Sequence, residues 1–200
     1  SVLVAVLEKL KDSFPPPPSY EPIAKAKPEE PMTINWASDR SGARPVIGLS
    51  SRTYHPTPAH WFQHIKLLGT QPRLPHVVLS DDNSLGNCWP LHGDHGSLVV
   101  QLAKQIRPQS FGICHLSSRF QIDRSSAPAT VQVWAIPDIT KPSPEDSILA
   151  ARFKYDLAGP DCQTFPVQAV DLPACHLYRL EVLDNHGKSD YTCIYQFLLY

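Results

Sequence analysis

The nine histidines and five cysteines are the side chains of this sequence best suited to metal binding or nucleophilic chemistry. The densest group, His92-Gly93-Asp94-His95, lacks the HExxH spacing of a zinc protease, and no third ligand lies near it in the sequence. No GxSxG motif marks a nucleophilic serine. The group is therefore typical of a surface turn before a strand, and the sequence favours a protein that is not an enzyme.

Two of the cysteines lie far apart in the chain, each within strand-forming aromatic sequence. One is in Gly86-Asn87-Cys88-Trp89 and the other in Tyr191-Thr192-Cys193-Ile194-Tyr195. A disulfide between them can join the last strand to the start of the core, and such a bond requires an oxidising compartment. No two cysteines have CxxC spacing, so a zinc site is not expected. We expect Cys88 and Cys193 to form this disulfide.

The other three cysteines leave the pairing open. Cys114 follows the apolar residues 111–113 and is predicted to be a buried core thiol. Cys162 and Cys175 flank a predicted hairpin near residues 169–170. They could face each other and form a second bridge or remain two free thiols, because spacing alone does not fix connectivity.

Composition indicates a single domain with extensions. The chain has 200 residues and a formal net charge of −1, so nothing indicates that it binds nucleic acid. Proline accounts for 21 residues, which predicts few interior helices and many loops. No apolar run reaches the roughly 18 residues of a membrane span, and the first residues lack a signal-peptide pattern. We expect any membrane anchor to lie upstream of the printed sequence.

The first 33 residues divide into a short helix and a linker. Apolar residues recur with helical spacing over 2–12, so residues 1–13 are predicted to be an amphipathic helix, either the end of a coiled-coil stalk or an autoinhibitory element. It is too short to be stable alone. Residues 14–33 form a Pro-rich, extended linker, and the compact domain is expected over 34–200.

Short strands dominate that domain. Turn-forming residues separate the apolar and alternating segments, which is the pattern of an all-β, antiparallel sandwich. The predicted strands cover residues 98–102, 111–116, 131–136, 148–155, 175–183 and 191–200.

One apolar segment, residues 54–76, does not fit a sheet because four prolines interrupt it. It either folds over its own core or projects as a β-hairpin lid that holds a peptide by strand addition. The lid side chains would be Trp61, Phe62, Ile65, Leu67 and Leu68.

The order of several short motifs resembles the SUN domain, the luminal module of inner-nuclear-membrane bridge proteins. The similarity extends over most of 34–200. The motifs include Gly86-Asn87-Cys88-Trp89, Ile106-Arg107-Pro108, Ser125-Ser126-Ala127-Pro128, Phe153-Lys154-Tyr155-Asp156, Asn185-His186-Gly187 and the closing run 191–197.

The resemblance implies a non-enzymatic peptide receptor. SUN domains are trimeric β-sandwiches that bind the C-terminal tails of KASH proteins in the perinuclear space. The resulting LINC bridge tethers the nucleus to the cytoskeleton. Residues 54–76 fall where the family has its lid, so the lid and a neighbouring subunit would enclose an extended tail, which would add a strand. A homotrimer in the nuclear envelope is therefore the expected assembly.

The resemblance also implies the site residues. Donors for the tail's terminal carboxylate fall at His115, Ser126, Tyr191 and Tyr195. A monovalent cation, expected to be potassium, would be held mainly by backbone carbonyls at Val77, Ser80, Asp82 and Asn87. The family's cysteine before the lid, which can bond covalently to the tail, is replaced here by Ser50, so binding should be non-covalent.

A second hypothesis is a discoidin-like, or galactose-binding, sandwich that binds a glycan or a lipid at its loop tips. Such a module needs exposed aromatic and polar side chains at those tips. The prominent aromatic residues here lie in 54–76 and at the C-terminus instead.

Overall fold

The computed structural model describes residues 34–56, 72–116, 119, 123–140, 142–143 and 145–200. The predicted helix at 1–13, the linker and the five lid side chains lie outside these residues. In the described part, the helices are the short 3-10 turns η1 (Asp39–Ser41), η2 (Ile47–Leu49) and η3 (Pro75–Leu79). No helix in that part is long and apolar enough to cross a membrane.

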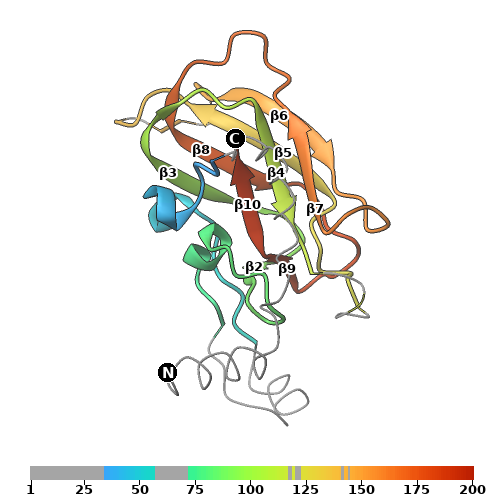
Figure 1. Ribbon diagram of the computed structural model, residues 1–200. Coiled ribbons are helices and arrows are strands. Elements are labelled where there is room, and N and C mark those ends of the chain that lie inside the picture. Colours follow the sequence, from blue (N-terminus) through green and yellow to red (C-terminus); the bar gives the residue numbers. More distant parts are fainter. Residues whose placement is uncertain (1–33, 57–71, 117–118, 120–122, 141, 144) are drawn as a thin grey trace, which may run out of the picture. The chain divides into compact units, whose positions relative to one another are not determined.

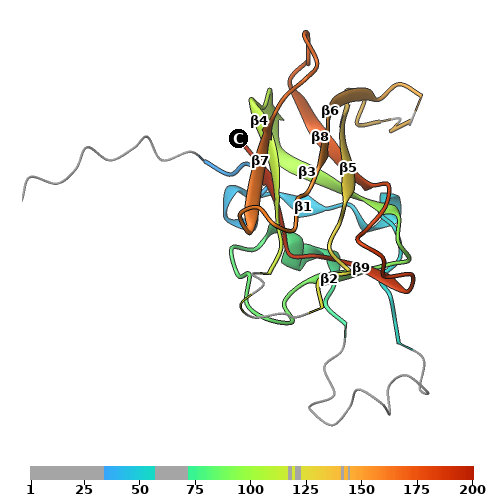
Figure 2. The ribbon, with the colours of Figure 1, turned by 90° about the vertical axis from the view of Figure 1, so that its right-hand side faces the viewer.

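One layer is a five-stranded antiparallel sheet (Figures 1 and 2). Buried and half-buried residues largely alternate along its central strand β8, so one face of the sheet is more deeply buried than the other. Its strands, in spatial order, are β1 (Arg44–Pro45), β3 (Gly96–Ile106), β8 (Cys175–Val182), β5 (Thr130–Ile136) and β6 (Ile148–Lys154).

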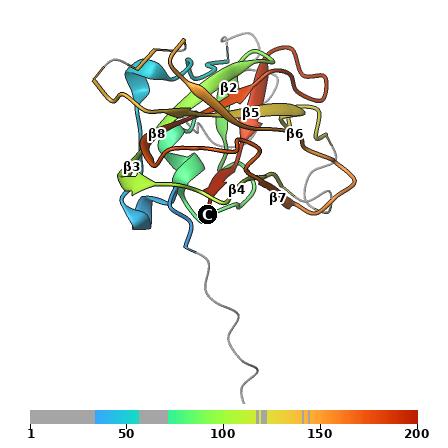
Figure 3. The same ribbon diagram turned by 90° about the horizontal axis from the view of Figure 1, so that it is seen from above.

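The second layer consists of two smaller sheets. The three-stranded sheet has the order β10 (Gln196–Leu199), β4 (Ser110–Cys114) and β7 (Cys162–Pro166). The two-stranded sheet pairs β2 (Trp89–His92) with β9 (Tyr191–Ile194). The last residue lies beside the start of β4, where the Tyr200 amide donates to the Ser110 carbonyl over 3.0 Å (Figure 3).

Aromatic rings from both layers meet in the core. The Phe111 ring of β4 lies 5.8 Å from Tyr178 of β8 and 6.3 Å from Phe197 of β10. Phe153 of β6 stacks on Phe165 of β7 with centroids 4.1 Å apart. This packing confirms the predicted all-β antiparallel sandwich.

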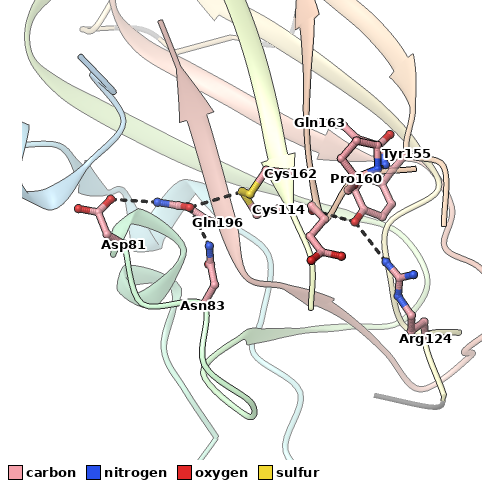
Figure 4. Close-up of a disulfide and its surroundings, with 10 residues drawn as sticks. Asp81, Asn83, Cys114, Arg124, Tyr155, Pro160, Cys162, Gln163 and Gln196 are labelled. Carbon is pink, nitrogen blue, oxygen red and sulfur yellow. Dashed lines mark hydrogen bonds between the residues drawn. A yellow bond between two sulfur atoms is a disulfide. The ribbon is translucent and has the colours of Figure 1, made fainter. Parts of the chain in front are cut away.

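The structure corrects part of the cysteine assignment. Cys88 is bonded to Cys193, as expected. Cys114, however, is bonded to Cys162, so predicting a free core thiol at Cys114 was wrong (Figure 4). The two residues are direct partners in the β4–β7 register, with Cα atoms 4.0 Å apart. Cys175 begins β8 in the other layer and is buried and free, which excludes the Cys162–Cys175 bridge.

Candidate functional site

Tyr195 is placed by a change of sheet. β9 ends at Ile194 and pairs with β2, whereas β10 begins at Gln196 and pairs with β4. Tyr195 lies between the two strands and belongs to neither. Its side chain is only 2% exposed and packs beside the Cys88–Cys193 disulfide, with half-buried Tyr191 on the same cluster.

His115 lies directly after β4 and faces this tyrosine. The two ring centroids are 5.0 Å apart in an edge-on arrangement, and His115 is 2% exposed. Nδ1 lies 3.4 Å from the Leu116 carbonyl oxygen, and Nε2 has no hydrogen-bond partner. Burial lowers the pKa of His115 to about 4, so the free protein holds a neutral imidazole with an unsatisfied buried nitrogen.

The tyrosine hydroxyl is also kept neutral. Burial raises the pKa of Tyr195, while a hydrogen bond with the backbone of Gly86 acts in the opposite direction. Proximity to Tyr191 raises it further. A neutral phenol can donate a hydrogen bond to an anion, which a phenolate cannot do.

Ser126 is fixed against the same strand. It is 3% exposed, and its carbonyl accepts a hydrogen bond from the Cys193 amide over 2.8 Å. The structure thus joins His115 to Tyr195 by ring contact, Tyr191 to Tyr195 by packing, and Ser126 to β9, which begins at Tyr191 and ends just before Tyr195.

Sequence reasoning missed Arg124. This residue is 8% exposed, and its guanidinium donates from Nη1 to the Leu157 carbonyl over 2.7 Å and from Nη2 to the Tyr155 hydroxyl over 3.4 Å (Figure 4). Its Nε has no partner. No ion pair in the described part of the chain includes Arg124. Its position next to Ser125-Ser126 was the available signal, but the sequence does not show that this charge is buried.

A carbonyl connects Arg124 to the histidine. The Tyr155 hydroxyl donates to the Asp161 carbonyl over 2.9 Å, and the His115 amide donates to the same carbonyl over 2.9 Å. The positive charge of Arg124 is close enough to contribute to the lowered pKa of His115, after burial. Asp161 acts on the His115 pKa in the opposite direction. His115 Nε2 and Arg124 Nε, two buried nitrogen atoms without hydrogen-bond partners, therefore lie in one region that also contains an acidic residue.

The residues predicted to hold a cation lie before Cys88. Val77 is part of η3, and its carbonyl accepts from the Ser80 amide over 3.1 Å. The Asp82 carbonyl accepts from Asn87 Nδ2 over 2.8 Å, and Asp82 Oδ1 accepts from the Ser84 amide over 2.9 Å. Hydrogen bonds from Ser84 lower the pKa of Asp82, so its carboxylate stays ionised.

Gln196 ties this loop to the sheet. Its Nε2 donates to Asp81 Oδ1 over 3.1 Å, and its Oε1 accepts from Asn83 Nδ2 over 3.0 Å (Figure 4). The side-chain oxygen of Asn83 is buried without a partner. An unsatisfied buried oxygen suits a hard cation, and this is the observation that fits the predicted ion.

Ser50 is engaged within the fold. Its hydroxyl accepts from the Val99 amide over 3.0 Å and donates to the Val46 carbonyl over 2.8 Å. Ser50 thus joins the start of the domain to β3.

The described part of the chain is a two-layer β-sandwich with two disulfide bonds, and buried hydrogen-bonding side chains gather beside the Cys88–Cys193 bond. The family model described as "Sad1 / UNC-like C-terminal" matches residues 70–200. This chain belongs to that family, the SUN-domain family.

Curated relatives from an animal and a plant also carry the name of the SUN domain. SUN domain-containing protein 2 of Mus musculus is 30% identical over 82% of this chain. SUN domain-containing protein 2 of Arabidopsis thaliana is 32% identical over 78% of it. The aligned parts span only 22% and 34% of those two relatives.

Solved structures with this fold include very different proteins. A family 32 carbohydrate-binding module from Streptococcus pneumoniae EndoD has a TM-score of 0.56 at 14% identity, covering 84% of this chain and 99% of that one. Allantoicase from Saccharomyces cerevisiae has a TM-score of 0.53 at 11% identity, covering 83% and 42%. At such identities the likeness shows a shared sandwich fold and nothing about ligands.

Proposed function

We propose that this domain is a receptor for the C-terminal tails of KASH proteins in the perinuclear space, and that it forms the inner half of a LINC bridge. Membership of the SUN-domain family supports this role. The observation that carries it is that His115 Nε2 and Arg124 Nε are both buried without hydrogen-bond partners, and we infer that they line a pocket for an anion.

The pocket has the chemistry of a carboxylate site. A buried guanidinium without a carboxylate partner is unfavourable, because its desolvation is not offset by an opposite charge. A terminal carboxylate would supply that charge and accept hydrogen bonds from the Tyr195 and Tyr191 hydroxyls and from Ser126. Placed near His115 Nε2, it would also favour a proton on that nitrogen.

The rest of the tail would be held by strand addition. The lid side chains named above would cover it, and a neighbouring subunit of a homotrimer would complete the groove. Tail binding would be non-covalent, because Ser50 replaces the reactive cysteine and its hydroxyl is bonded within the fold.

We further propose that a monovalent cation, potassium in the first instance, orders the loop beside the pocket. Carbonyls at Val77, Ser80, Asp82 and Asn87 would hold it, with the Asn83 oxygen as a further ligand. Because the Gly86 backbone contacts Tyr195, exchanging potassium chloride for choline chloride should weaken tail binding and increase amide hydrogen exchange over 80–87. Unchanged exchange and affinity would contradict the ion.

The test of the receptor proposal uses two forms of a synthetic KASH-type tail, one with a free C-terminal carboxylate and one amidated. We expect the free acid to bind at least about tenfold more tightly, as befits hydrogen bonds to a charged group. Tyr195→Phe should reduce that preference, and Tyr200→Phe serves as the matched control. Equal binding of the two peptides would contradict the proposal.

A further inference from the structure

A second basic region lies at the other side of Tyr191. An open cleft of about 560 Å³ separates residues 51–55 from the turn between β2 and β3. Its lining includes Arg52, His55, His92 and His95. None of the side chains that line it is a carboxylate.

Backbone hydrogen bonds hold the two walls of this cleft together. Ser51 and Ser97 are joined twice, by the Ser51 amide to the Ser97 carbonyl over 2.8 Å and by the Ser97 amide to Ser51 Oγ over 2.9 Å. The His92 amide donates to the Arg52 carbonyl over 3.0 Å. A Cβ atom at Gly96 would lie 2.7 Å from both Ser51 Oγ and the Leu91 side chain, so only glycine allows this close approach.

The cleft is separate from the carboxylate pocket. Tyr54, which follows the first wall, stacks on Tyr191 with ring centroids 5.3 Å apart and lies 5.9 Å from the His92 ring. The aromatic pair therefore stands between the cleft and the cluster that contains Tyr195.

The one permanent charge on the lining of the cleft is positive, which suits an anion. Arg52 is permanently charged and exposed, and its planar guanidinium suits a carboxylate or a phosphate. The acidic neighbours are Asp94, whose Oδ1 lies 2.6 Å from His95 Nδ1, and Asp190, which acts on Tyr54 together with Lys188. No three metal-ligating side chains in the described part of the chain are grouped to hold an ion.

We propose that this cleft is an oxyanion-binding subsite, which takes a phosphate or carboxylate group through Arg52 and the imidazole N–H groups of His55, His92 and His95. This subsite would bind a phosphate or an acidic side chain, not the terminal carboxylate of a tail. It does not depend on tail binding, so it can exist even if the domain is not a receptor for KASH tails.

The experiment titrates the whole isotopically labelled chain with inorganic phosphate and, separately, with acetate, followed by NMR of the histidine rings and the backbone. We expect saturable shifts at His55, His92 and His95. Arg52→Gln should weaken the phosphate response about tenfold, as expected for loss of a charged hydrogen-bond donor. Arg152→Gln, which removes an exposed arginine of β6, is the control and should change nothing.

The phosphate and acetate titrations distinguish the two kinds of ligand group. Tighter binding of phosphate than acetate assigns the cleft to a phosphorylated group, and comparable binding assigns it to an acidic side chain. Shifts spread over the whole surface, or an equal response in Arg52→Gln, would overturn the proposal. A zinc titration that saturates the same three rings at lower concentration than phosphate would overturn it in favour of a metal site.

Discussion

The carboxylate pocket and the basic cleft each contain one arginine and at least one histidine, yet their surroundings differ. Arg124 is 8% exposed and its histidine is 2% exposed, whereas Arg52, His55, His92 and His95 are all exposed. Burial lowers the local dielectric response, so a charge in the pocket interacts strongly with an incoming anion. In the cleft, water and salt screen the same interaction. The pocket can therefore determine specificity, while the cleft adds a weaker, adjustable contribution.

Removing the Cys88–Cys193 disulfide should have the largest effect, and it should weaken tail binding more than phosphate binding in the cleft. The bond closes a separation of 105 residues and borders Tyr195. The Cys88→Ala/Cys193→Ala variant should lose about 2–5 kcal/mol of unfolding free energy in urea, together with tail binding. Cys114→Ala/Cys162→Ala, which opens a separation of 48 residues, should lose less. Loss of phosphate binding in the first variant while tail binding persists would reverse our comparison.

Acidification should destabilise the fold through the pocket histidine. The pKa of His115 is lowered from 6.5 to about 4, so the unfolded chain binds more protons than the folded one between these values. Unfolding free energy should therefore fall as pH falls from about 6.5 to about 4, by about 3 kcal/mol for this residue. Urea titrations at several pH values would measure this slope. His115→Gln should flatten it, and His76→Gln, which removes an exposed histidine of η3, should leave it unchanged.

Replacing the buried arginine should selectively weaken binding of a free carboxylate. Arg124→Gln removes the only charge of the pocket that favours an anion permanently, so the free-acid tail should bind about tenfold more weakly. The amidated tail should be almost unaffected, and fluorescence anisotropy with both peptides gives the ratio. Arg152→Gln again provides the control. Equal weakening of both peptides would mean that Arg124 only supports the fold.

The smallest expected effect is a difference between the two sites in how strongly salt weakens ligand binding. Because the cleft is exposed, phosphate binding there should weaken several-fold between low and physiological ionic strength. The free-acid preference of the pocket should change less over the same range. A steeper salt dependence in the pocket would contradict the difference in burial on which the comparison depends.

Sequence patterns predicted the strands well where local alternation is strong. The predicted strands at 98–102, 131–136 and 148–155 correspond to β3, β5 and β6. The predicted strand at 191–200 is instead divided at Tyr195, because its two halves pair with different partners. The strand β7 was missed, and with it the Cys114–Cys162 bond, since that pairing depends on the register between β4 and a distant edge strand.

The family resemblance assigned four residues to the proposed pocket but did not include the buried charge beside them. His115 and Tyr195 were assigned together, and their rings do meet. Arg124 and Tyr155 were not, because a sequence does not report which charged side chain will be desolvated. The cleft was missed for a related reason: His92-Gly93-Asp94-His95 was correctly placed before a strand, but Arg52 and His55 reach it only through the tertiary pairing of residues 51–55 with β2.

The most direct test of the carboxylate pocket is the ring nitrogen NMR of His115 as pH is varied, with and without the tail peptide. A carboxylate bound near Nε2 should raise the pKa of His115 from about 4, and the amidated peptide should not. Titration of His115 that is identical in the free protein and in the complex saturated with the free acid would contradict the pocket.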